Sequence, residues 1–128
     1  MDTTMSGHNG VSMSQRNDRL SVTLQGYLVP ETISLLNTDL LQYIQTHKIN
    51  LVIFDVSAIS VLDLTEFNTL YSISLMIKLM GAESIFTGFN PGVVAFLILA
   101  GADVSGINTV SELDDIDRAL SHSKLRID

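Results

Sequence analysis

The alternation of apolar and polar residues predicts that the chain begins with a β-hairpin. Residues 20–26, LSVTLQG, place their leucines and valine on one side and polar residues on the other, as in a half-buried strand. A weaker alternation over residues 11–15 predicts an edge strand that pairs with it. Residues 1–10 are small and polar, and we expect them to form a disordered tail.

Four segments then have the features of helices. Pro30 suits the first position of a helix, and Asp63 suits the position just before one. Asn90 and the proline after it begin a third helix, which Gly101 ends. Ser111 begins a fourth helix. The residues expected to face the core from the first helix are Ile33, Leu36, Leu40 and Ile44.

The remaining strands complete an α/β pattern. Residues 50–56, NLVIFDV, are apolar without alternation, as in a central strand covered on both faces, and we expect this strand to end at Asp55. Residues 84–88 and 106–110 predict two further short strands. Because strands and helices follow one another closely, the sequence predicts a single α/β domain over residues 11–128 with a mixed sheet.

Composition narrows the choice of partners. The 128 residues carry a net charge of −7, and no cluster of Lys and Arg offsets it, so we expect no nucleic-acid binding. Apolar residues make up 46% of the chain and charged residues 16%, a balance that favours an oligomer or an apolar contact surface. Cysteine is absent and the three histidines lack metal-ligand spacing, so we expect neither a metal nor a cofactor.

The sequence also argues against export and membrane insertion. The N-terminal segment lacks the basic and apolar stretches of a signal peptide. The longest unbroken apolar run, VVAFLILA at 93–100, is far shorter than the roughly 20 residues that span a bilayer. We therefore expect a cytoplasmic protein. The apolar run is interpreted either as a core helix or as one wall of a groove for a small apolar ligand.

Two apolar stripes run along the predicted helix at 64–80. The first faces the core and consists of Phe67, Leu70, Ile73, Ile77 and Met80. The second is rotated by roughly 100° and consists of Leu64, Tyr71, Leu75 and Leu79. Either neighbouring helices of the same domain cover the second stripe, or another polypeptide does. Between the two ends of the first stripe only Lys78 is charged, which favours an intermolecular contact.

The acidic residues near this helix have structural explanations. Asp63 and Glu66 stand three residues apart, which is the spacing of a capping box. A catalytic carboxylate pair would also need a base, a metal or a positioned substrate. Asp55 lacks the additional acids and the lysine of a phosphate-accepting receiver site, and we expect it to bind the amides that follow it. These observations predict a protein without enzyme activity.

Several motifs, in their order and spacing, resemble the STAS domains of anti-sigma-factor antagonists. The closest resemblance is to the RsbS-type and RsbR-type subunits of the bacterial stressosome. The motifs are LVIFDV, VLDLTEF, KLMGA, TGFNP and LAGAD, and the resemblance covers residues 11–120. It implies a sheet of four or five strands with helices mainly on one face. It also implies a non-enzymatic module that binds paralogous STAS proteins and a serine/threonine-kinase-like switch protein.

The resemblance implies a phosphorylation switch at the residue after the loop aspartate, which here is Leu64. Leucine cannot carry a phosphate, so we expect the switch to be lost, with Thr65, Ser60 or Ser57 as alternative acceptors. The predicted partner-binding surface consists of Asp63, Leu64, Thr65, Asn68, Tyr71, Ser72, Leu75 and Leu79. The predicted function is that of an RsbS-like stressosome subunit that forms oligomers and sequesters or releases a switch kinase. The alternative is a STAS accessory subunit of a lipid-transport complex.

Overall fold

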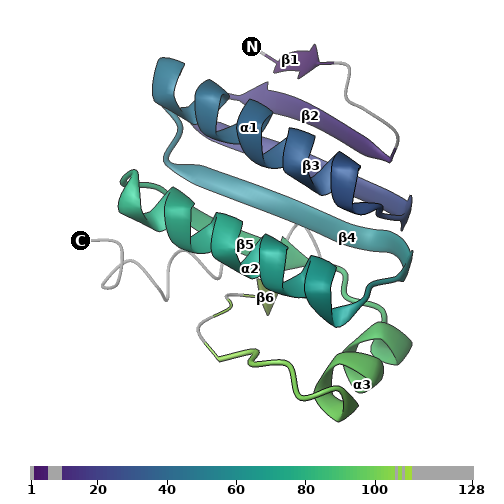
Figure 1. The fold of residues 1–128 in the computed structure, drawn as a ribbon. Helices are drawn as coiled ribbons and strands as arrows, with labels where there is room; N and C mark the ends of the chain where they lie inside the picture. Colours follow the sequence, from purple (N-terminus) through teal and green to yellow (C-terminus); the bar gives the residue numbers. More distant parts are fainter. Residues whose placement is uncertain (1, 6–9, 106, 108, 111–128) are drawn as a thin grey trace.

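One mixed β-sheet and three helices make up the described part of this computed structural model, which comprises residues 2–5, 10–105, 107 and 109–110 (Figure 1). The strands are β1 (Asp2–Met5), β2 (Val11–Arg16), β3 (Arg19–Tyr27), β4 (Leu51–Val61), β5 (Glu83–Thr87) and β6 (Thr109–Val110). The helices are α1 (Pro30–Thr46), α2 (Leu64–Leu79) and α3 (Pro91–Leu99).

The six strands lie in the sheet in the order in which they occur along the chain. Strands β1, β2 and β3 are antiparallel, whereas β3, β4, β5 and β6 are parallel. Helices α1 and α2 connect consecutive parallel strands and lie side by side on the same face of the sheet (Figure 1). The predicted α/β class, the mixed sheet and the placement of helices on one face are confirmed.

The main core lies between this face and the two helices. All four α1 residues predicted to face inward are buried, and so are Leu20, Val22 and Leu24 of β3. On α2 the first stripe is buried at its first four positions. Met80 differs from the prediction, because the helix ends before it and leaves 41% of its side chain exposed. The rings of Phe54 and Phe86 stack across β4 and β5 with their centroids 4.7 Å apart.

The opposite face of the sheet carries a smaller apolar cluster of Leu51, Ile53 and Ile85. Along β4, Leu51 and Ile53 alternate with Val52 and Phe54, which face the helices, so β4 is buried on both faces as predicted. This double burial explains why the strand's sequence shows no alternation.

The structure differs from the sequence prediction at the sheet edges. Asp2–Met5 forms β1 and pairs with β2, although the sequence predicted a disordered tail there. Strand β2 is therefore not the outermost strand. Strand β4 does not end at Asp55 but continues to Val61, because its pairing with β3 survives two register shifts. The helix predicted to begin at Ser111 lies outside the described residues.

Gly88, just after β5, allows the chain to pass close to β4, and this gives a test of the packing. Its φ is +85°, and an added Cβ would lie 2.6 Å from the Cβ of Ser57. We expect Gly88→Ala to lower the free energy of unfolding by about 2–5 kcal/mol, since backbone strain and overpacking add. Gly81→Ala is the matched control, because Gly81 has φ +92° and no heavy atom of the described ranges lies within 4 Å of its added Cβ. The control should lose only about 1–2 kcal/mol. Equal losses in urea denaturation would contradict the predicted close contact.

Candidate functional site

The parallel strands β3, β4 and β5 end at one edge of the sheet, and the chain passes from this edge into α2 (Figure 1). The Asp55 carboxylate shapes β4 on the way, because its Oδ1 accepts hydrogen bonds from the Ser57 backbone N–H (3.0 Å) and from the Ser57 hydroxyl (2.7 Å). This confirms the role predicted for Asp55. The register with β3 shifts at this point, and β4 then runs on until Val61 lies opposite Tyr27.

Asp63 occupies the N-cap position of α2, as predicted, but does not cap the helix with its side chain. Its carbonyl accepts the first helical hydrogen bond from the Phe67 backbone N–H at 2.9 Å, while its carboxylate makes no cap hydrogen bond. The predicted reciprocal capping box is therefore wrong on the Asp63 side. The next two residues differ in their exposure to solvent, since Leu64 is half-buried and Thr65 is exposed. Leu64 is thus less exposed than the hydroxyl-bearing residue beside it.

Glu66 is turned inward at the start of α2 and is only 6% exposed. Among the residues that the structure describes, its Oε1 has no hydrogen-bond partner. Burial raises the pKa of the Glu66 carboxyl above its usual value, and the negative charge of Asp63 and a hydrogen bond between the two side chains raise it further. Hydrogen bonds from the backbone N–H groups of Asp63 and Glu66 lower this pKa in part. A hydrogen bond between two carboxyl groups requires a proton on one of them. This arrangement therefore favours the neutral form of Glu66.

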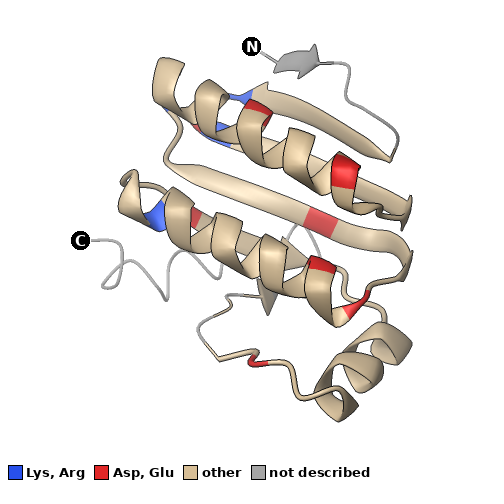
Figure 2. Ribbon diagram, in the orientation of Figure 1, with Lys and Arg blue, Asp and Glu red and all other residues tan. Residues whose placement is uncertain are grey.

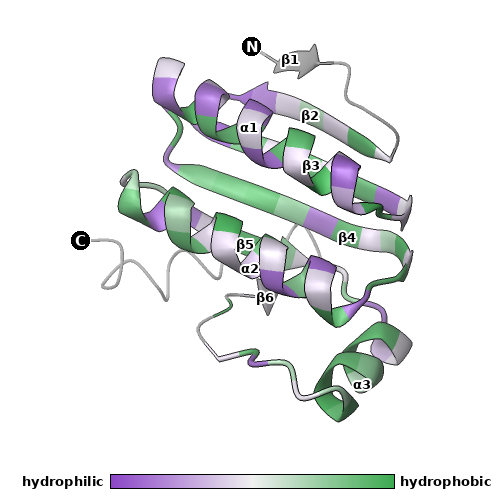
Figure 3. Ribbon diagram, viewed as in Figure 1, coloured by the Kyte–Doolittle hydropathy of each residue, from purple (hydrophilic) through white to green (hydrophobic). Residues whose placement is uncertain are grey.

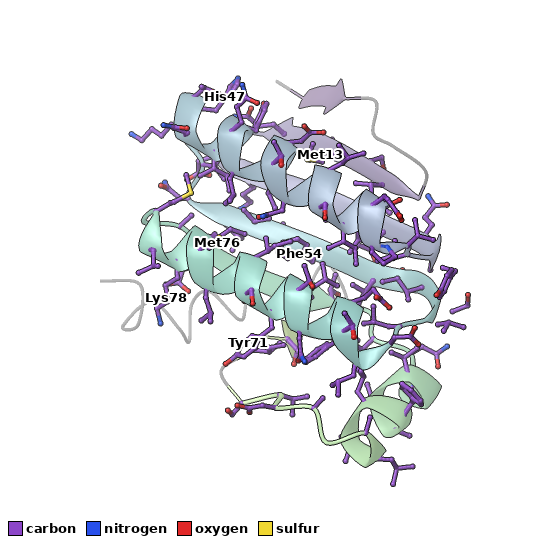
Figure 4. The ribbon with its side chains drawn as sticks, viewed as in Figure 1. Met13, His47, Phe54, Tyr71, Met76 and Lys78 are labelled. Atoms are coloured by element: carbon purple, nitrogen blue, oxygen red, sulfur yellow. The ribbon has the colours of Figure 1, made fainter. Side chains whose placement is uncertain are left out.

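The second stripe of α2 is divided between the protein's own chain and solvent. Tyr71 is half-buried and donates a hydrogen bond from its hydroxyl to the Ser105 carbonyl at 3.1 Å, on the side of α2 that faces the segment after α3 (Figure 4). Leu75 and Leu79 are 49% and 87% exposed. Of the alternatives left open by the sequence, coverage within the domain holds for Tyr71, whereas the described part of the chain leaves about half of the Leu75 side chain and most of the Leu79 side chain exposed.

The polar members of the predicted partner surface lie on the outside of α2. Asn68 and Ser72 are both exposed. Among the other candidate phosphate acceptors, Ser60 is exposed near the end of β4, and Ser57 is exposed but engaged with Asp55. The structure thus gathers Asp63, Leu64 and Thr65 at one end of α2 and Leu75 and Leu79 toward the other.

Three apolar residues near the same sheet edge were not predicted as site residues. Tyr27 at the end of β3 is 58% exposed, Val61 at the end of β4 is 48% exposed, and Val29 before α1 is 37% exposed. Tyr27 and Val61 are register partners, so they lie next to each other. The signal available in the sequence was the break in alternation at residues 27–29, where consecutive apolar residues precede Pro30.

Helix α3 is apolar on all sides but is not enclosed. The Asn90 side chain caps it by accepting a hydrogen bond from the Gly92 backbone N–H at 2.7 Å, as its position predicted. Val93 and Leu97 are buried, yet Leu99 is 88% exposed. Figure 3 shows the helix as a strongly hydrophobic segment set apart from α1 and α2. Interpreting this run as a helix buried all round is therefore wrong.

Within the described ranges no group of acidic, histidine or cysteine residues is arranged to hold a metal ion. Across the same residues, none of the helices combines the length and the apolarity that a membrane span requires.

Glu66 generates a prediction about pH. Because the folded protein holds this proton more tightly than the unfolded chain, the contribution of Glu66 to stability is full below its ordinary pKa of 4.5 and is lost as the pH rises through the raised value. Glu66→Gln should therefore gain stability relative to the wild type as the pH rises from 4.5 to neutrality, measured by urea denaturation. Glu31→Gln, at an exposed first-turn position of α1, is the matched control. A constant difference between Glu66→Gln and the wild type at all pH values would refute the prediction.

Comparison with known proteins agrees with this architecture. The STAS domain family model matches residues 10–115. Among curated proteins, none matches closely enough to count as a relative. The structure of a single-substitution variant of RsbS from Moorella thermoacetica is 23% identical with a TM-score of 0.75, and the alignment covers 89% of this chain and 97% of that one.

Two further solved structures show the same fold. One, described as the molecular architecture of the stressosome, is 24% identical with a TM-score of 0.70 and coverage of 88% and 98%. The other, the anti-sigma factor antagonist SpoIIAA in its unphosphorylated form, is 12% identical with a TM-score of 0.65 and coverage of 84% and 96%. Because the family model spans most of the sequence and the fold agrees, the chain belongs to the STAS domain family.

Proposed function

We propose that this protein is a non-enzymatic, RsbS-like regulatory subunit that assembles with paralogous STAS proteins and holds a serine/threonine switch kinase. Its family membership and its structural similarity to RsbS and to a stressosome subunit support this assignment. The observation that carries the proposal is the exposed apolar surface of α2 and the neighbouring sheet edge. An acidic protein with such a surface is suited to bind other polypeptides.

Leu64 determines how this contact is regulated. In the proposed subunit it stands where the switch residue of the family would stand, and it has no hydroxyl group. A phosphate at that position would add a charge of about −1.5 to −2 beside Asp63 and Glu66. Such a charge would release an acidic or apolar partner by repulsion and desolvation. With leucine in its place, we infer that the contact persists without this control.

The proposed contact surface has two apolar parts, one at the start of α2 and one at its end. At the start, Leu64 is the first residue of α2 and follows Val61 by three positions, and Val61 is the register partner of Tyr27. At the end, Leu75 and Leu79 project from a helix whose exposed side carries a single charge, that of Lys78 (Figure 2). Interface centres are depleted in charge in the same way. We infer that the paralogous STAS proteins contact one of these two apolar parts and that the kinase contacts the other.

Phosphorylation provides the first test. We expect the wild-type protein, incubated with ATP and its cognate switch kinase, to show no added phosphate by intact mass spectrometry. Leu64→Ser restores a hydroxyl at the first helical position, where the helix N-terminus favours an anion, and should gain one phosphate. Peptide mapping identifies the modified residue. Phosphate on Thr65 or Ser60 of the wild type would overturn the proposed loss of the switch.

A charge on the outer face of α2 provides the second test. Leu75→Glu places a carboxylate in the proposed contact and should weaken assembly with paralogues or kinase at least tenfold, about 1.4 kcal/mol. Gel filtration and binding titration measure the loss, and circular dichroism checks the fold. Leu35→Glu on α1 is the matched control, because that leucine has a similar exposure of 43%. Unchanged assembly of the Leu75 variant, or equal weakening by both variants, would reject the proposed surface.

A further inference from the structure

We propose that a pocket between α2, α3 and the chain leading to β6 binds a neutral small molecule that contains an aromatic ring. The pocket has a volume of about 530 Å³ and is partly open to solvent. Small-molecule sites commonly have volumes of about 300–1,000 Å³. The apolar residues that line it are Phe67, Phe89, Val94, Leu97, Val104 and Ile107.

The walls of the pocket are held in place by contacts outside it. The Tyr71 hydroxyl ties the segment after α3 to α2 through the Ser105 carbonyl. The Ala102 backbone N–H donates to the Leu97 carbonyl at 2.9 Å and closes the end of α3. The start of the same helix is fixed by the Asn90 cap. A ligand would therefore enter a space that is largely formed before it binds.

The lining selects against charge. None of the described lining residues is charged, and the sequence from Ser84 to Ala102 contains no Asp, Glu, Lys or Arg (Figure 2). The other lining residues are Thr109, whose side chain carries a hydroxyl group, and Gly88, which has backbone atoms only. An ion that enters this space gives up part of its hydration, and no charged side chain among the described lining residues compensates for that loss. A neutral, mainly apolar molecule with one polar group fits this chemistry.

Two aromatic side chains point to the kind of apolar molecule. Phe67 lines the pocket from α2 and Phe89 from the segment between β5 and α3. Stacking on the core holds the Phe89 ring in position. It stacks on Phe86 with the ring centroids 5.8 Å apart, and Phe86 stacks in turn on Phe54. Fixed aromatic walls favour a flat aromatic guest through offset stacking or edge-to-face contacts.

The experiment uses two probes with the same ring system, 2-naphthol and 2-naphthalenesulfonate, titrated into the full-length protein at pH 7 and followed by fluorescence. We expect saturable binding of 2-naphthol with an increase in the melting temperature, and binding of the sulfonate at least tenfold weaker. Nuclear Overhauser effects from 2-naphthol to the ring protons of Phe67 and Phe89 should locate the probe. Absence of saturable 2-naphthol binding, or equal affinity for both probes, would overturn the proposal.

Two matched variants test the location. Val94→Trp fills the pocket from α3 and should abolish 2-naphthol binding, whereas Ala95→Trp adds the same ring at the next, exposed position and should leave binding unchanged. Val104→Trp blocks the pocket from outside the helix if the first variant fails to fold by circular dichroism. Wild-type affinity in a folded blocking variant would place the probe elsewhere and refute the site. The outcome does not depend on the proposed assembly function, because neither the probes nor the variants involve a partner protein.

Discussion

The parallel pairing of β3 with β4 is the contact on which the rest of the structure depends. It joins the antiparallel strands to the parallel ones, and side chains on both strands, including Val22 and Phe54, are completely excluded from solvent. Because β3, β4 and β5 follow one another in the same direction, successive right-handed crossovers place α1 and α2 on one face. The same pairing brings the starts of both helices to one edge of the sheet.

The local geometry of β4 then determines where the candidate surface lies. Asp55 binds Ser57 and shifts the strand's register, yet the pairing continues to Val61. The chain has only Leu62 and Asp63 in which to leave the strand and begin α2. Leu62 is buried, which anchors this short connection. The first turn of α2 is therefore held against the sheet edge, and its exposed side is presented in a fixed orientation.

Much of this fold could be predicted because its signals are local and periodic. The inward stripes of α1 and α2, the doubly buried β4 and the caps of α3 follow from residue spacing alone. The exposure of α3 could not be predicted, since an apolar run has the same sequence whether or not something covers it. The Tyr71–Ser105 contact joins residues 34 positions apart, and no local pattern indicates it. The site was predicted in outline, but the capping box forms on one side alone, because Glu66 accepts a hydrogen bond from the Asp63 backbone N–H whereas the Asp63 carboxylate makes no cap hydrogen bond.

The charges around the start of α2 explain why leucine suits this position in the proposed contact. Asp63 and the buried Glu66 already supply two acidic groups, and the basic residue of the same helix, Lys78, lies at its opposite end (Figure 2). Burial and mutual repulsion disfavour the second negative charge here. A phosphate at this position would add to that repulsion, whereas an apolar side chain adds none. A partner can therefore cover Leu64 without removing a further charged group from water. The desolvation cost of a persistent contact at Leu64 is lower than that of a contact that would have to bury a phosphate.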